Sequence, residues 1–226
     1  MKTIVVVGGS SGIGKAIIDT LKDQHKIINI SRTEPESHKN LNHYSCDVVK
    51  DELPILEDDI HGLVYCPGSI NLKSFSRLKI EDFQNDFEIN VMGAIKTLKA
   101  YESSLAKNNG SVVLFSTVAS FLGMPFHASI ATSKSAIEGL TKSLAAEYAT
   151  KIRFNAIAPT VTDTPLATRL LRNEKQQESL QNRHPLKKYL KPAEVASLAS
   201  YLLSDDAAAI TGQIIPIDAG IVSVKL

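Results

Sequence analysis

The segment that most constrains the fold is an apolar run followed directly by a glycine-rich turn. The run Ile4-Val5-Val6-Val7 stops at Gly8, and the turn Gly8-Gly9-Ser10-Ser11-Gly12-Ile13-Gly14 leads into apolar residues with helical spacing. A β-branched run predicts a buried strand, and apolar residues three and four apart predict a helix. Strand, turn and helix in this order predict a phosphate site, because the first N–H groups and the positive dipole end of a helix attract an anion.

The same alternation of strand and helix patterns continues along the chain. The expected strands are Thr3-Val7, Lys26-Ile30, Gly62-Tyr65, Ser111-Phe115, Arg153-Ala158 and Gln213-Ile217. Helical spacing lies between them at Ile13, Ala16, Ile17 and Leu21, at Phe83, Phe87, Val91 and Ile95, at Ala136, Ile137, Leu140, Leu144 and Tyr148, and at Val195, Leu198 and Leu202. Apolar strands joined by helices predict an α/β fold, a single Rossmann-type doubly wound parallel sheet with helices on both faces. Residues 1–226 are expected to form one NAD(P)-binding domain, in which the polar, basic stretch 164–191 serves as a substrate lid.

Composition argues against several classes of partner. With Lys+Arg 25 against Asp+Glu 24, the net charge of +1 creates no overall field for nucleic acid or an anionic membrane. The two cysteines, Cys46 and Cys66, are too few for a disulfide framework and lack zinc-site spacing, so no metal is expected. The apolar run at Ile4 is far shorter than a signal peptide core or a membrane span. We therefore expect a cytoplasmic protein that acts on a small molecule, without a nucleic acid or membrane partner.

The second expected strand indicates which dinucleotide is bound. It ends Asn29-Ile30-Ser31-Arg32, where a site for NAD(H) usually carries an acidic side chain for the ribose 2'-hydroxyl. Ser31 and Arg32 could instead hydrogen-bond and neutralise a 2'-phosphate. This favours NADP(H), with NAD(H) as the alternative and a solvated loop arginine as the plainer interpretation of Arg32.

Together with later motifs, these features resemble the short-chain dehydrogenase/reductase family over nearly the whole chain. Gly8-x-x-x-Gly12-x-Gly14 is similar to the family's TGxxxGxG turn, although Val7 stands in the place of the threonine. Later matches are Cys46-Asp47-Val48, Tyr65-Cys66-Pro67-Gly68, Ile89-Asn90-Val91-Met92-Gly93, Ser133-Lys134-Ser135-Ala136, Arg153-Phe154-Asn155-Ala156-Ile157-Ala158-Pro159, Ile210-Thr211-Gly212-Gln213 and Asp218-Ala219-Gly220. The resemblance implies these cofactor-binding residues: Gly8, Ser10, Ser11, Gly12, Ile13, Gly14, Ser31, Arg32, Asp47, Val48, Gly68, Asn90, Lys134, Pro159, Thr162 and Thr164.

The chain departs from the family pattern at the position of the general acid. The family has a tyrosine four residues before the lysine and a serine thirteen residues before that tyrosine, where this chain has Ile130 and Thr117. Threonine keeps a hydroxyl, whereas isoleucine can neither donate nor accept a proton. Some enoyl-reducing relatives place the tyrosine seven residues before the lysine, where His127 stands, and a histidine can act as acid or base. The candidate catalytic residues are therefore Asn90, Thr117, Lys134 and His127, with an ordinary loop residue as the alternative for His127.

Two functions follow from this pattern. The first is an NADP(H)-dependent oxidoreductase that reduces an enoyl or carbonyl group of a small molecule or acyl conjugate. The second is a catalytically degenerate relative that acts as a nucleotide-binding or partner subunit. Basic residues in the expected lid could favour an anionic substrate, or they could simply be solvated: Arg169, Arg172, Lys175, Arg183, Lys187 and Lys188.

Two further expectations rest on the resemblance. It implies a homo-oligomer, a dimer or a tetramer, formed through the helix that carries Lys134, the helix before it and the apolar stretch Ile214 to Val224. In the segment Pro159-Thr160-Val161-Thr162-Asp163-Thr164, Thr160 replaces a glycine of the family's PGxVxT motif. We therefore expect the approach of the backbone to the cofactor to be altered there.

Overall fold

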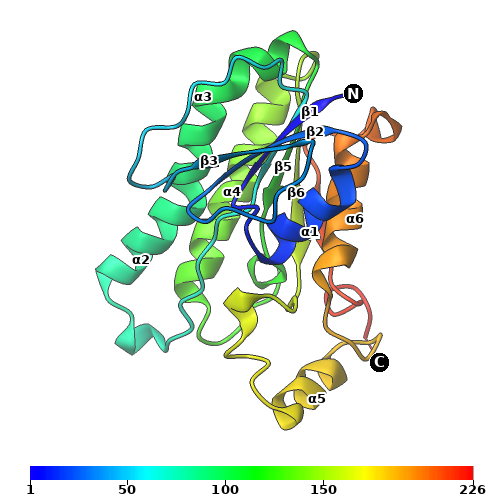
Figure 1. Cartoon of the computed structure of the whole chain (residues 1–226). Coiled ribbons are helices and arrows are strands. Elements are labelled where there is room, and N and C mark those ends of the chain that lie inside the picture. The colour runs from blue at the N-terminus through cyan, green and yellow to red at the C-terminus, as the bar shows by residue number, and fades with distance from the viewer. Residues whose placement is uncertain (226) are drawn as a thin grey trace.

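The computed structural model describes residues 1–225 and is built around one parallel sheet of seven strands (Figure 1). Neighbouring strands pair in the order β3-β2-β1-β4-β5-β6-β7. The strands from β1 to β3 are therefore added toward one edge of the sheet and those from β4 to β7 toward the other, so the strand order reverses between β1 and β4. Ligands bind outside the carboxyl ends of strands at such a reversal. The strands are β1 (Thr3–Val7), β2 (Lys26–Ser31), β3 (Leu41–Ser45), β4 (Gly62–Tyr65), β5 (Ser111–Phe115), β6 (Arg153–Pro159) and β7 (Ile214–Ile217).

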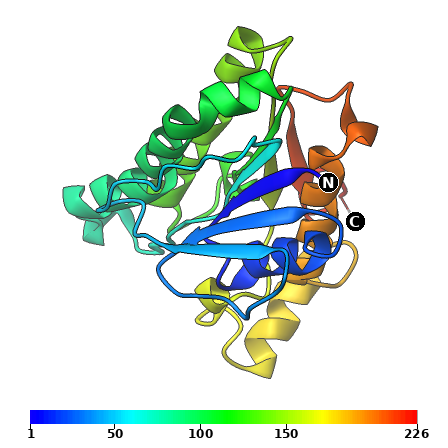
Figure 2. The ribbon, with the colours of Figure 1, turned by 45° about the horizontal axis from the view of Figure 1, so that its top comes forward.

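Helices cover both faces of this sheet (Figures 1 and 2). On one face lie α1 and α6, and on the other lie α3 and α4, with α2 joined to α3 through the π-helical segment η2. The helices are α1 (Gly12–Leu21), α2 (Ile80–Phe87), η2 (Glu88–Met92), α3 (Gly93–Lys107), α4 (Ala128–Glu147), α5 (Glu174–Arg183) and α6 (Pro192–Leu203). Short 3-10 turns complete the chain at η1 (Phe75–Arg77), η3 (Val118–Ser120), η4 (Pro165–Ala167) and η5 (Asp205–Ala207).

The alternation of side chains along each strand divides the core into two layers. Val5 and Val7 of β1 pack toward α3 and α4, whereas Ile4 and Val6 pack toward α1 and α6. Successive side chains of a strand point to opposite faces, so a strand covered on both sides must be apolar throughout. The predicted doubly wound α/β fold is therefore confirmed, and all six expected strands are present within one residue of their predicted ends.

One strand, β3, was not expected from the sequence. Its residues Leu-Asn-His-Tyr-Ser are half-buried or exposed, because the strand lies at the edge of the sheet. It pairs with β2 through the backbone, from Ile27 opposite Leu41 to Ser31 opposite Ser45. Backbone pairing leaves no hydrophobic pattern, so periodicity could not reveal this strand.

The expected lid, residues 164–191, runs from η4 through α5, which stands apart from the sheet at the bottom of Figure 1 and has no buried residue. The two ends of the segment are held together. An isolated bridge pairs Thr162 with Leu190, and Lys191 forms an ion pair with Asp163 at 2.8 Å. Of the helices within residues 1–225, none is both long and apolar enough to cross a membrane.

Candidate functional site

A cleft of about 850 Å³ opens at the carboxyl ends of β1, β2 and β4, where the strand order reverses. It brings together most of the residues that the sequence predicted for cofactor binding, from segments as distant as the glycine turn and η4. Those that line the cleft are Gly8, Ser10, Ser11, Gly12, Ile13, Gly14, Ser31, Arg32, Asp47, Val48, Gly68 and Thr164. Asn90, Lys134, Pro159 and Thr162, by contrast, are not among its lining residues.

The glycine turn is packed too closely for side chains. Gly8 and Gly12 have φ of +78° and +55°, a region that glycine adopts without strain. A Cβ on Gly14 would lie 2.3 Å from the carbonyl oxygen of Gly8, so the first turn of α1 presses directly on the loop. A Cβ on Gly12 would lie 3.2 Å from Cγ2 of Thr164, which places the cleft end of η4 against the loop. The glycines therefore let the first turn of α1 and Thr164 pack directly against the loop, whose Ser10 and Ser11 line the cleft.

A buried amide that the sequence did not single out holds this loop in place. Asn29 of β2 is fully buried, and its Oδ1 accepts a hydrogen bond from the Gly9 N–H at 3.0 Å. Its Nδ2 donates to Ser31 Oγ at 2.8 Å and to His43 Nδ1 at 3.1 Å. The Ser31 hydroxyl in turn donates to the carbonyl of Thr33 at 2.8 Å. Asn29 thus links the phosphate loop to the end of β2, where Arg32 lies exposed at the rim of the cleft.

At the inner end of the cleft, Gly68 brings together two of the predicted catalytic residues. The position of a Cβ on Gly68 lies 3.2 Å from Asn90 Oδ1 and 3.7 Å from Lys134 Nζ. The Asn90 Oδ1 is buried and has no hydrogen-bond partner among the described residues. Lys134 Nζ donates to the carbonyl of Phe115 at 2.9 Å. Burial lowers the pKa of Lys134 to about 8, and the electrostatic effects of Cys66 and Asp86 oppose this shift.

Asn90 lies in the π-helical segment η2, which interrupts the regular helix between α2 and α3. Its Nδ2 donates to the carbonyl of Asp86 at 2.7 Å and to Ser69 Oγ at 2.9 Å. Single π-helical turns within a helix are frequent at functional sites. Here the turn carries a buried amide whose acceptor oxygen faces Gly68.

The segment expected to hold the general acid has no tyrosine. Ile130 in the first turn of α4 is buried, with 5% of its surface exposed. Thr117 follows β5 and caps η3, where its Oγ1 accepts from the Ala119 N–H at 3.3 Å, so the hydroxyl hydrogen stays free to donate. His127 is the N-cap residue of α4, and its Nδ1 bonds with the carbonyl of Pro125 at 2.8 Å. Within the described residues, His127 makes no hydrogen bond to Thr117 or Lys134.

The residue that replaces the expected glycine after β6 contacts the predicted lid. Thr160 is buried, and its Oγ1 lies 2.7 Å from Nε2 of His184, which is itself buried. His184 Nδ1 lies 2.6 Å from the carbonyl of Leu180, which can only accept, so Nδ1 carries a hydrogen. Both nitrogens are thus engaged, and His184 fixes the end of α5 to the end of β6. A lone histidine in a polar helix gave no sequence signal for this role.

The basic residues of the same segment are largely exposed. Lys188 forms an ion pair with Glu194, and Lys187 donates to the carbonyl of Asn182 at 3.2 Å. Solvent-exposed charges of this kind contribute little to stability. None of these basic residues lines the cleft.

Comparison with known proteins agrees with the geometry. A family model described as enoyl-(acyl carrier protein) reductase matches residues 8–222. The 3-oxoacyl-acyl-carrier-protein reductase of Rickettsia prowazekii is 31% identical over 237 residues, which cover 99% of this chain and 98% of the relative. A short chain dehydrogenase family protein from Francisella tularensis has a TM-score of 0.90 at 29% identity, with 99% and 100% of the two chains covered. The structure of ElxO with NADP bound has a TM-score of 0.89 at 27% identity, with 99% of each chain covered.

Proposed function

The chain belongs to the family of short-chain dehydrogenases and reductases, and we propose that it is an oxidoreductase that uses NADP(H) to reduce an enoyl or carbonyl group. The substrate would be a small molecule or an acyl conjugate. The observation that carries the proposal is that Asn90 Oδ1 and Lys134 Nζ both lie near Gly68, which lines the same cleft as the glycine turn.

The residues of the cleft fit a dinucleotide. Backbone N–H groups of the turn and the N-terminus of α1 suit a pyrophosphate, and side chains at Gly12 and Gly14 would press on Thr164 and the Gly8 carbonyl and so distort the turn. Ser31 and Arg32 at the end of β2 suit a 2'-phosphate, and the NADP bound in the similar structure of ElxO supports this choice. Asn90 Oδ1 and Lys134 Nζ offer an acceptor and a donor to a ribose hydroxyl. A nicotinamide bound there would supply the hydride.

The chain's own residues would orient the substrate and hold its oxygen. The Thr117 hydroxyl has a hydrogen free to donate, so it can stabilise an oxygen on which charge develops. Near neutral pH the Lys134 ammonium is the major form, because the pKa of about 8 lies above it. Ile130 cannot supply the proton that completes the reaction, so it would come from His127 or from water. His127 would need to be an imidazolium that donates through Nε2, since Nδ1 is engaged with Pro125.

A fluorescence titration with NADPH and NADH tests the cofactor, and NADPH oxidation at high enzyme concentration tests the reaction. The panel of substrates should contain ketones, enoyl thioesters and their acyl-carrier conjugates, since the matched relatives are named for such substrates. The proposal is supported by tight NADPH binding and by consumption of NADPH with at least one class. Absence of NADPH binding would refute the cofactor assignment, and binding without any turnover would refute the reaction.

The buried Ile130 favours a second candidate, a catalytically degenerate relative that binds the nucleotide and serves as a sensor or partner subunit. Fold alone does not fix function, and a binding site can persist without chemistry. The variant Ile130→Tyr separates the two. Ketone reduction that appears only in the variant would indicate a lost activity, whereas an active wild-type protein would exclude the degenerate alternative.

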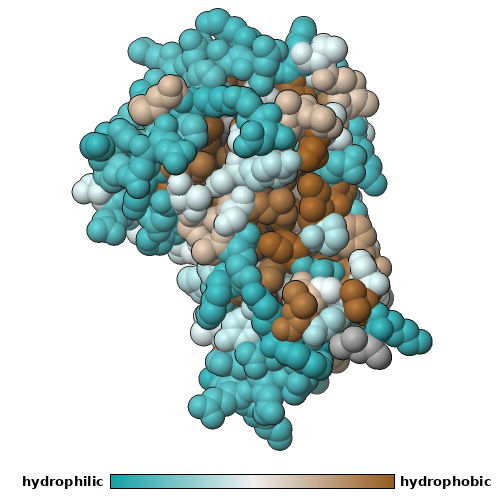
Figure 3. All heavy atoms as spheres, turned by 90° about the vertical axis from the view of Figure 1, so that its right-hand side faces the viewer, coloured by the Kyte–Doolittle hydropathy of each residue, from teal (hydrophilic) through white to brown (hydrophobic). Residues whose placement is uncertain are grey.

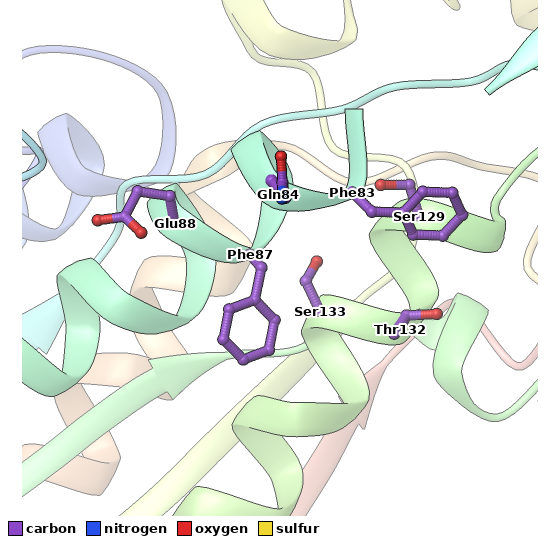
Figure 4. Close-up of a pocket in the computed structure, with 7 residues that line it drawn as sticks. All are labelled: Phe83, Gln84, Phe87, Glu88, Ser129, Thr132 and Ser133. Carbon is purple, nitrogen blue, oxygen red and sulfur yellow. The ribbon is translucent and has the colours of Figure 1, made fainter. Parts of the chain in front are cut away.

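We also propose that the protein is a homo-oligomer. A groove of about 340 Å³ lies between α2 and α4, where Phe83 and Phe87 flank Ser129 and Ser133 (Figure 4). Hydrophobic side chains also gather on the face that carries α6 and the end of the chain (Figure 3), and β7 there is only half-buried. Sedimentation is expected to show a dimer or tetramer, and a single 24.5 kDa species would contradict this.

A further inference from the structure

A buried carboxylate lies behind the catalytic asparagine, and the proposed reaction does not account for it. Asp86 in α2 is fully buried, and it has no ion-pair partner among the described residues. Burying a carboxylate without hydrogen bonds or a counter-charge is costly, so its surroundings must compensate. A simple helix-packing position would be occupied by an apolar side chain at lower cost.

Three side chains from two other segments donate hydrogen bonds to this carboxylate. Ser69 Oγ and Asn71 Nδ2 donate to Oδ1 at 2.5 and 2.9 Å, and Ser129 Oγ donates to Oδ2 at 2.5 Å. Ser69 and Asn71 follow Gly68 in the loop after β4, and Ser129 lies on the side of α4 that faces α2 (Figure 4). Asp86 therefore ties together the loop, the start of α4 and the turn before Asn90.

This arrangement fixes the direction of the Asn90 amide. The only hydrogen of the Ser69 hydroxyl is given to Asp86, so its oxygen is left as an acceptor, and Asn90 Nδ2 donates to it at 2.9 Å. A second acceptor, the backbone carbonyl of Asp86, lies 2.7 Å from the same nitrogen. The amide therefore places its nitrogen toward Asp86 and its oxygen toward Gly68 and Lys134.

We propose that Asp86 is a positioning residue, which acts through Ser69 to direct Asn90 Oδ1 toward the space beside Gly68, with Lys134 across that space as its electrostatic partner. An acceptor oxygen and a donor nitrogen then face the same space beside Gly68. This pair is complementary to one hydroxyl group or one water molecule, which can donate to the first and accept from the second. The site would thus select a hydroxyl at that point, and loss of either link would weaken the selection.

Two groups from other elements, Cys66 and Asp86, act electrostatically on Lys134, and they differ in charge. From the end of β4 comes Cys66, whose pKa burial raises to about 12, so the thiol is neutral at physiological pH. From α2 comes Asp86, whose charge favours the ammonium. Glu138, one turn further along α4, accepts hydrogen bonds from Ser116 at 2.5 Å and from Ser120. Because the thiol is neutral, Asp86 is the one of these two groups whose charge favours the Lys134 ammonium.

Two variants test the two links separately, and a third is the matched control. Asp86→Asn keeps the shape of the side chain and removes its charge. Ser69→Ala keeps the charge and cuts the path to Asn90. Ser129→Ala also removes one hydroxyl from Asp86, but from the carboxylate oxygen that is not connected to Asn90.

The readouts are NMR signals that require no cofactor. The ε-carbon of Lys134, assigned by its absence in Lys134→Arg, reports the titration of the ammonium. We expect Asp86→Asn to lower its midpoint by about 0.5–1 pH unit, because removing a nearby opposite charge destabilises the ammonium. The side-chain amide of Asn90, assigned by its absence in Asn90→Asp, should lose hydrogen-exchange protection by about tenfold in Ser69→Ala, the effect of one net hydrogen bond. Ser129→Ala should change neither signal.

An unchanged Lys134 midpoint in Asp86→Asn would overturn the electrostatic link. Equal loss of Asn90 protection in Ser69→Ala and Ser129→Ala would overturn the hydrogen-bond link. This measurement uses no variant of Asp86, so it can still be made if Asp86→Asn does not fold. The inference deepens the proposed function, since it takes Asn90 and Lys134 to face the cofactor. Failure to bind NADPH would count against the proposed function alone, because neither readout depends on binding.

Discussion

Replacing Asn29 by leucine should both destabilise the protein and weaken the cofactor cleft. The leucine is of similar size but cannot hydrogen-bond, so the Gly9 N–H loses its acceptor, and Ser31 and His43 each lose a donor. A buried donor left without a partner costs about 1–3 kcal/mol. The other two losses are smaller, because Ser31 still donates to the carbonyl of Thr33 and His43 is half-buried. We therefore expect a total loss of about 2–4 kcal/mol in the free energy of unfolding.

Thermal unfolding measures this loss directly. For a domain of this size, each kcal/mol lowers Tm by about 2–4 °C, so Asn29→Leu should lower it by about 4–16 °C. Asn42→Leu is the matched control, since Asn42 lies exposed on the edge strand β3, and surface changes of this kind stay within about 0.5 kcal/mol. A Tm of Asn29→Leu within the error of the control would show that the amide does not hold the loop.

The same variant links stability to binding. NADPH at one hundred times its Kd stabilises a folded protein by about 2.7 kcal/mol. If the Gly9 turn loosens and Kd rises tenfold, the same NADPH concentration would stabilise Asn29→Leu by only about 1.4 kcal/mol. Equal stabilisation of both proteins by NADPH would refute the view that Asn29 shapes the phosphate site, even if the variant is less stable.

Three further outcomes follow from the site. Arg32→Ala should raise the Kd for NADPH by about tenfold or more, because a charge-assisted hydrogen bond contributes about 1.5–3 kcal/mol, and it should leave the Kd for NADH unchanged. Equal effects on the two Kd values in a fluorescence titration would argue against a contact with the 2'-phosphate. NADPH affinity of the wild type should fall as the pH rises through about 8, since Lys134 loses its ammonium there, and Lys134→Met should bind weakly at every pH. His184→Leu removes the contact with Thr160 and should make tryptic cleavage within residues 164–191 about 5–30 times faster, the population change for 1–2 kcal/mol; an unchanged rate would mean that the segment is held elsewhere.

The fold could be predicted from the sequence wherever burial leaves a pattern. Strands such as β1 and β5 are buried on both faces and are therefore runs of apolar residues, and the helices between them carry apolar residues on one side. The edge strand β3 lacks that signal because its pairing involves the backbone alone. For α5 the reason is similar, since a helix with no buried residue has no apolar face to detect.

The candidate site could be predicted only where its residues follow one another in the chain. The spacing of the glycine turn and of Ser133-Lys134 is local and visible, so both could be identified as motifs. Asp86, by contrast, reads as one more acidic residue on an amphipathic helix. Its burial depends on Ser69, Asn71 and Ser129, which the fold brings from positions up to 43 residues away. Sequence spacing does not indicate contacts between such distant residues, so the role of Asp86 could be inferred only from the three-dimensional structure.

The arrangement of the site also bears on how a chain with Ile130 at the start of α4 can keep its predicted cofactor residues. The glycine turn joins β1 to α1, and Asn29 and Arg32 lie in and directly after β2. Thr117 and Ile130, in contrast, lie in the segment after β5 and in α4. The two sets share only the inner end of the cleft, where Asn90 and Lys134 lie beside Gly68. Residues that share no contacts contribute to stability nearly independently, so a change at Ile130 need not disturb the phosphate site. Asn90 and Lys134 fit both candidate functions, because the acceptor and the donor beside Gly68 suit a ribose hydroxyl whether or not a reaction follows. The two candidate functions therefore differ at Thr117, His127 and Ile130, and the variant Ile130→Tyr tests that segment without altering Asn90 or Lys134.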